Sequence, residues 1–175
     1  NPKTMRYIFT VVMIMMLTFS LQAQDDRIES FRGIEWGTHI DSVIVEGQPF
    51  VFYKVEKDDD ENGGNFYQLK NDKMIIGSVA LTNIYYVFSD EDSRLYKIVL
   101  EGRKNDVAEM EFIVDYKYGE SANKDVTDNQ VIKQWIVEDV TLTLSDFSYN
   151  KFELEFESDW EAALNYEKNT SVTDF

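Results

Sequence analysis

Hydrophobic and polar residues alternate with a period of two near the C-terminal end of the sequence, and this pattern constrains the fold more than any other feature. Phe152, Leu154 and Phe156 fall on one side of an extended segment, and the alternate positions 151, 153, 155 and 157 are lysine or glutamate. Such a strand has one face in a core and the other in water. The sequence therefore predicts a sheet with one covered face and one wet face.

The same kind of pattern predicts seven strands. Their expected ranges are 50–55, 65–69, 79–88, 94–100, 131–137, 140–145 and 149–157. The acidic turn at residues 89–93 joins two of them into a hairpin. The other connections are too short for the crossovers that a parallel sheet needs, so we expect an antiparallel sheet.

Helical signals predict three short helices. We expect them over residues 38–45, over residues 105–118 with Gly119 as the stop, and after a cap at Ser158 or Asp159. The order is then helix, four strands, helix, three strands, helix, which suggests two related halves. The expected fold class is α+β, with a few short helices packed on one face of the antiparallel sheet.

The first 23 residues predict export. Arg6 precedes a short apolar run, and Ala23 is a small residue at a suitable cleavage position. The run is short for a membrane span, so a cleaved signal peptide is the main hypothesis and a retained anchor the alternative. We expect residues 1–23 to comprise upstream residues and the signal peptide. Residues 24–175 are then a single domain, periplasmic or secreted, without a transmembrane span.

Charge and composition narrow the function classes. With 33 acidic and 17 basic residues, the formal net charge is −16, which disfavours nucleic acid and favours cationic partners or divalent ions. The chain has no cysteine, so disulfides and a lipidated N-terminal cysteine are excluded. His39 is the single histidine and has no partner for a structural zinc site, and no nucleophile elbow is present. We expect a non-catalytic protein without a cofactor.

The segment 31–43 and the turn that follows it carry a resemblance. Gly37 precedes the first expected helix, Val43 lies on the buried face of that helix, and Gly47 and Pro49 lead toward a hairpin. In these features the segment resembles the opening of small bacterial envelope proteins of the BamE/SmpA-like and β-lactamase-inhibitor-protein-like kind. The resemblance implies a non-catalytic module that binds another protein through a sheet face or connecting loops.

Aromatic residues around one strand supply the candidate partner-binding residues. They are Tyr85, Tyr86, Phe88 and Tyr96. Both faces of the strand 84–88 carry large side chains, and few helices are expected to cover them, so one row can lie at the surface and mark a contact. The alternative is that all of these residues belong to the core.

One acidic loop allows two interpretations. Asp58, Asp60 and Asn62 have the spacing of a calcium loop, with Gly63 at its sharp turn. The closing acid is missing, because Leu69 stands at the twelfth position. Asn-Gly is also a strong hairpin-turn signal, so a metal-free acidic loop is favoured over a calcium site.

Together these observations predict an exported protein-binding or inhibitor-like module whose partner is another envelope or extracellular protein. The first alternative is a carbohydrate-binding module that uses exposed aromatic residues. The second is a hydrolase with a carboxylate pair. An apolar patch ringed by acids would favour protein binding, an aromatic platform beside a groove would favour sugar binding, and a buried acid pair in a cleft would favour the hydrolase.

Overall fold

The computed structural model describes residues 28–45, 48–56, 64–127, 130–147 and 150–159. Before the main sheet come two small hairpins with a short helical turn between them: β1 (Ser30–Phe31) with β2 (Ile34–Glu35), the 3₁₀ helix η1 (Ile40–Ser42), and β3 (Ile44–Val45) with β4 (Gln48–Pro49). Helical structure follows at the 3₁₀ helix η2 (Lys104–Asp106) and the helix α2 (Val107–Tyr118).

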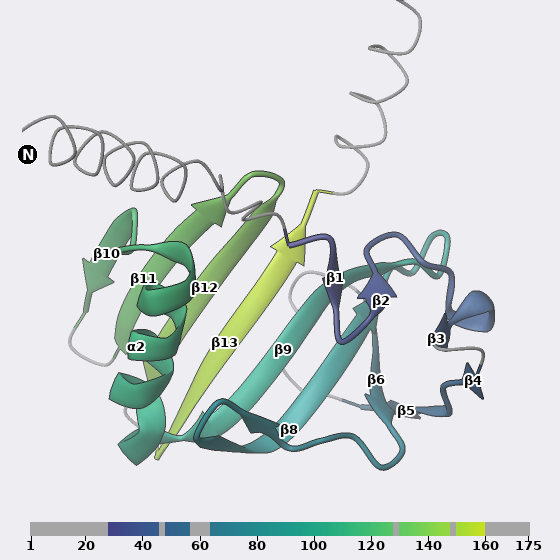
Figure 1. Cartoon of the computed structure of the whole chain (residues 1–175), viewed down its shortest axis with the longest axis horizontal. Helices are drawn as coiled ribbons and strands as arrows, with labels where there is room; N and C mark the ends of the chain where they lie inside the picture. The colour runs from purple at the N-terminus through teal and green to yellow at the C-terminus, as the bar shows by residue number, and fades with distance from the viewer. Residues whose placement is uncertain (1–27, 46–47, 57–63, 128–129, 148–149, 160–175) are drawn as a thin grey trace, which may run out of the picture.

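A nine-stranded antiparallel sheet is the centre of the fold. Its strands are β5 (Phe52–Val55), β6 (Asn65–Leu69), β7 (Ile75–Ile76), β8 (Val79–Phe88), β9 (Leu95–Arg103), β10 (Asn123–Val126), β11 (Gln130–Val137), β12 (Val140–Phe147) and β13 (Lys151–Ser158). They lie in the order β10-β11-β12-β13-β9-β8-β6-β5, and β7 pairs with β8 beside this path. Figure 1 shows α2 and the β1–β2 hairpin on the same side of the sheet.

The sheet consists of two meanders. β5, β6, β8 and β9 are successive neighbours, and so are β10, β11, β12 and β13. The last strands of the two meanders, β9 and β13, pair antiparallel at the centre. α2 precedes the second meander, whereas in the described part of the chain the first meander is preceded by the short η1 and the small hairpins.

The strand predictions agree closely with the structure. The ranges 65–69 and 79–88 coincide with β6 and β8, and the other five differ from their strands by at most three residues at an end. The short strands of the small hairpins, β7 and β10 were not predicted. Two to four residues are too few to show a period.

The expected α+β class with several helices is wrong, because the described residues form a mainly antiparallel β protein with α2 as their single α-helix. In the range 38–45 the helical structure is limited to η1, and the chain is extended from Val43 into β3. The β-branched run Val43-Ile44-Val45 favours extended backbone over a helix this short. The third expected helix lies outside the described residues beyond Asp159, and Ser158 ends β13.

One face of the sheet, which we call the covered face, packs against α2 and the N-terminal segment. α2 contributes the buried Met110 and Val114, and the β1–β2 hairpin contributes Phe31 and Ile34. The indole Nε1–H of Trp135 donates to an Asp115 oxygen at 2.9 Å and to the Gly119 carbonyl at 3.0 Å. These bonds tie the C-terminal end of α2 to β11.

The predicted signal peptide lies among residues that the structure does not describe. Within the described ranges, no helix combines the length and apolar character needed to cross a membrane. The export prediction therefore still depends on the sequence pattern of residues 1–23.

Candidate functional site

Six polar residues cross the face of the sheet that points away from α2, which we call the outer face. We name these residues the polar row: Tyr53 on β5, Gln68 on β6, Asn83 on β8, Glu101 on β9, and Lys151 and Glu153 on β13. Asn83 and Glu101 alternate along their strands with the core residues Ile84 and Leu100. Successive residues of a strand point to opposite sides, so the polar row faces away from the core.

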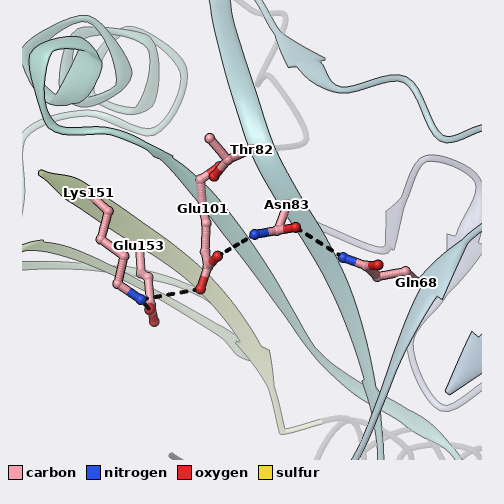
Figure 2. Close-up of polar contacts among 6 residues, drawn as sticks. All are labelled: Gln68, Thr82, Asn83, Glu101, Lys151 and Glu153. Carbon is pink, nitrogen blue, oxygen red and sulfur yellow. Dashed lines mark hydrogen bonds and ion pairs between the residues drawn. The ribbon is translucent and has the colours of Figure 1, made fainter. Parts of the chain in front are cut away.

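Hydrogen bonds connect the polar row from strand to strand. The Tyr53 hydroxyl donates to Gln68 Oε1 at 2.9 Å, and Gln68 Nε2 donates to Asn83 Oδ1 at 3.2 Å. Asn83 Nδ2 then donates to Glu101 Oε2 at 2.7 Å. Figure 2 shows the part of this chain from Gln68 to Glu153. Each amide is both donor and acceptor, which orients these side chains on the outer face.

Two glutamates stand directly opposite each other at the centre of the sheet. Glu101 and Glu153 are register partners on β9 and β13, and their side chains are 9% and 11% exposed. Like charges in such positions repel. Lys151 bridges them, with Nζ 2.6 Å from Glu153 Oε1 and 3.4 Å from Glu101 Oε1. Burial lowers the pKa of Lys151, but the hydrogen bonds and charges of both glutamates outweigh it and raise that pKa above its usual range.

An acidic stripe continues along β13. Glu153, Glu155 and Glu157 share the outer face, at alternate positions of the strand. Lys97 Nζ lies 2.9 Å from Glu157 Oε2 and 3.7 Å from Glu155 Oε2. Burial lowers the pKa of Lys97, and these two carboxylates together raise it by a larger amount. The outer face therefore combines a fixed ion network with an excess of carboxylates.

An apolar patch lies on the same face as the polar row. We call it the outer patch, and its members are the buried Phe66, Val87 and Val99 with the partly buried Val55, Tyr85 and Tyr96. The rings of Phe66 and Tyr85 meet edge to face, with centroids 6.0 Å apart. Burial first, and then the Glu101 charge, raises the pKa of Tyr85. The outer patch and the acidic side of the polar row are thus in direct contact.

The four predicted partner-binding residues are divided between the two faces. Tyr85 and Tyr96 belong to the outer patch. Tyr86 and Phe88 are 0% and 1% exposed and belong to the main core on the covered face. The strand carries large side chains on both sides, as expected. Because a buried residue cannot anchor a partner, Tyr86 and Phe88 are no longer candidates for partner binding.

The predicted calcium ligands Asp58, Asp60 and Asn62 lie outside the described residues. In the ranges that are described, no group of three or more histidine, cysteine, aspartate or glutamate side chains is placed to hold a metal ion. The calcium loop stays a prediction from the sequence.

Two exposed aromatic residues were missed by the sequence reasoning. Phe112 and Tyr116 are 64% and 85% exposed on α2, and their rings stack at 6.3 Å between centroids. They are four residues apart, so they share one helix face beside the buried stripe that contains Met110 and Val114. Aromatic residues outside the apolar stripe of an amphipathic helix are the signal that could have found them.

The acid pair and the cleft found between α2 and the N-terminal segment are on different sides of the molecule. A cleft of ≈ 390 Å³ opens on the covered face and is lined by residues of α2, β1 and β13. Glu101 and Glu153 lie on the outer face and are bridged by Lys151. The arrangement of a buried acid pair inside a cleft, which would favour a hydrolase, is not formed by these residues.

No family model, no curated protein and no solved structure matches the chain. The resemblance of the segment 31–43 to bacterial envelope proteins stays a prediction, and the outer face is the basis for a functional proposal.

Proposed function

We propose that this protein is a non-catalytic protein-binding module that contacts its partner with the outer face of the sheet. The observation that carries the proposal is the outer patch, whose partly buried members Val55, Tyr85 and Tyr96 adjoin the polar row and the acidic stripe. Protein interfaces combine an apolar, aromatic centre with a polar rim in this way. Tyr85 and Tyr96 are the proposed aromatic contacts, and Tyr53, 49% exposed, lies at the end of the polar row.

The charge of the outer face indicates the kind of partner. Glu153, Glu155 and Glu157 give it an excess of carboxylates, and the whole chain has a formal net charge of −16. A surface of this sign accelerates association with a basic partner and suppresses wrong pairings with acidic ones. We propose a partner with basic residues around an apolar contact, located in the cell envelope or outside the cell because of the predicted export signal.

Affinity capture with matched variants tests the proposal. The tagged protein is incubated with an envelope extract of its source, and bound proteins are identified by mass spectrometry. We expect one partner at a fixed stoichiometry that is lost with Tyr85→Ser or Tyr96→Ser and retained with Tyr116→Ser. Circular dichroism establishes that each variant is folded.

The opposite pattern would contradict the proposed surface. A partner that is lost with Tyr116→Ser and retained with both outer-face variants would place the interface on α2. If no protein is retained above background, protein binding itself is contradicted.

A carbohydrate-binding module is the second candidate, and the polar row is the observation that favours it. Amide and carboxylate groups can hydrogen-bond sugar hydroxyls, and Tyr53 offers a half-exposed ring beside Gln68. A glycan array separates this candidate from protein binding. Binding of a glycan that is lost with Gln68→Ala and with Tyr53→Ser would support it over the first proposal.

We propose no catalytic role for the carboxylate pair. Lys151 contacts both Glu101 and Glu153, and Asn83 donates to the remaining oxygen of Glu101. A glycoside hydrolase needs one carboxyl group as an acid and the other as a base or nucleophile, each with access to the substrate. Both carboxylates of this pair are instead committed to contacts within the sheet.

A further inference from the structure

The cleft on the covered face is an apolar pocket between α2 and the N-terminal segment. Its floor is formed by Leu154 and Phe156 of β13, and its size is ≈ 390 Å³. The walls are mainly apolar as well: Ile28, Phe31, Ile76, Met110, Ile113, Val114 and Tyr118. Small-molecule sites are commonly clefts of roughly 300–1,000 Å³ with this kind of lining.

Both walls of the cleft are held in place by contacts outside it. α2 is tied to β11 through the Trp135–Asp115 hydrogen bond, and Ser78 Oγ donates to Glu109 Oε1 at 2.7 Å. On the other side, Arg32 forms an ion pair with Asp72 and donates to the Ile75 carbonyl at 3.1 Å. The pocket is therefore preformed, which lowers the ordering cost of binding a ligand.

The size of the cleft limits the size of the ligand. An apolar cavity of about 150 Å³ accommodates benzene. By proportion, a cleft of ≈ 390 Å³ has room for a ligand on the order of fifteen non-hydrogen atoms. A linear acyl chain of about ten to twelve carbons has this size and matches the aliphatic and aromatic lining.

The mouth of the cleft has one available cation. Glu29, Arg32 and Lys117 are the charged residues of the lining. Arg32 is committed to Asp72, whereas the ammonium of Lys117 lies over the ring of Tyr118 at 4.9 Å and forms no ion pair with a carboxylate of the described residues. An anionic group at the end of an apolar ligand would find its charge partner at Lys117.

We propose that this cleft binds a medium-chain amphiphile with a carboxylate or other single anionic head group. The acyl chain packs on Leu154 and Phe156, and the head group lies at the mouth beside Lys117. The site is on the covered face, so it is independent of the partner surface proposed for the outer face. The same chemistry is offered by a free fatty acid and by one acyl chain of an anionic lipid.

Calorimetric titration with dodecanoate and with dodecanol, each below its aggregation concentration, tests the proposal. We expect saturable 1:1 binding of dodecanoate to the purified protein. Lys117→Gln removes the head-group partner and should weaken dodecanoate about tenfold while leaving dodecanol unchanged. Ile76→Trp fills the cleft from its wall and should weaken both ligands, whereas Tyr116→Ser on the far side of α2 should weaken neither.

A second arm distinguishes the two sources of the ligand. Vesicles of phosphatidylglycerol offer the same acyl chain and anionic head within a bilayer. If free dodecanoate binds and Ile76→Trp abolishes this binding, the ligand is a soluble fatty acid. If the vesicles bind and Ile76→Trp abolishes that binding, the ligand is a lipid. The proposal is overturned if neither form binds, or if Ile76→Trp and Lys117→Gln both bind the ligand as strongly as the parent protein does, because the ligand then does not enter the cleft.

Discussion

A buried tyrosine, an aspartate and an arginine hold the N-terminal hairpin against the sheet. The Tyr86 hydroxyl donates to Asp72 Oδ2 at 2.9 Å, and Arg32 pairs with the other oxygen of the same carboxylate. The Asp72 side chain is 7% exposed, so it depends on both partners for the solvation it has lost. These three residues come from β8, from the loop before β7 and from the turn between β1 and β2.

Removing the arginine should cost more than removing the hydroxyl. Arg32→Met leaves a buried carboxylate without its cation, and we expect a loss of about 3 kcal/mol in the free energy of unfolding. Tyr86→Phe removes one hydrogen bond and should cost about 1 kcal/mol. Urea denaturation of both variants measures the difference, and an equal loss would show that the Arg32 cation stabilises Asp72 no more than the Tyr86 hydroxyl does.

The same tyrosine predicts a loss of stability in alkali. Burial, followed by the charge of Asp72, raises the pKa of Tyr86 well above its usual value. The unfolded chain releases this proton near pH 10, whereas the folded protein still holds it there. The stability that comes from the protonated Tyr86 hydroxyl is therefore complete below about pH 10 and is lost as the pH rises further. Tyr86→Phe should lose less stability than the parent between about pH 8 and about pH 11. Identical losses in the two proteins would rule out this residue as the cause.

The bridging lysine of the polar row predicts a compensating pair of substitutions. Lys151→Met leaves Glu101 and Glu153 opposed across the central strands, and because Lys151 is partly exposed we expect a loss of only about 1–2 kcal/mol. Adding Glu153→Gln removes the repulsion and should restore part of that loss. A double-mutant cycle measured by thermal unfolding checks the coupling. Additive effects would show that the three charges act separately.

At the scale of elements, the pairing of the central strands β9 and β13 places the ring of Phe152 where a side chain at position 102 would lie. A Cβ atom built on Gly102 would lie 2.3 Å from Cζ of Phe152, its register partner on β13. The Phe152 ring lies over the glycine backbone and fills the space that another side chain would occupy. The glycine and the ring are therefore complementary in shape at the junction of the two meanders.

Gly102→Ala should therefore destabilise the protein by about 2–3 kcal/mol through overpacking. Adding Phe152→Leu shortens the opposing side chain and should recover part of the loss. Thermal unfolding of the single and double variants is the measurement. If Gly102→Ala is neutral, the ring moves without cost and does not control the junction.

At the scale of the whole molecule, the two meanders form one continuous sheet. β9 and β13 join them and have other strands on both sides, while β5 and β10 are the edges of the main path. The four residues of β10 are all exposed, whereas most of β9 is buried. Stability should therefore decrease from the centre of the sheet toward its two edges.

Hydrogen exchange can measure this gradient directly. We expect the slowest amide exchange in β9 and β13, because their backbone groups are released only by global unfolding. Exchange in β10 and β5 should be faster because these edge strands can open locally. If one meander exchanged uniformly faster than the other, the two halves would be separate folding units instead.

Periodicity in the sequence was sufficient to predict the positions of the long strands. β6 and β8 were predicted to the residue because alternating side chains and turn residues mark both ends. The helix α2 was predicted for a similar reason, from apolar residues at helical spacing and Gly119 at its end. The helix predicted over 38–45 failed because a few residues of amphipathic pattern cannot outweigh the extended preference of Val43, Ile44 and Val45.

The sequence alone determined the long strands, the antiparallel sheet, and the division of β13 into one apolar and one charged side, because these properties depend on near neighbours in the chain. Tertiary structure decided that Tyr86 belongs to the main core whereas Tyr85 is partly exposed on the outer face, since both are large aromatic residues and the segments packed on each side of the sheet distinguish them. It also assembled the polar row and the cleft. Their residues come from distant parts of the chain, and no local pattern records which distant segments will pack together.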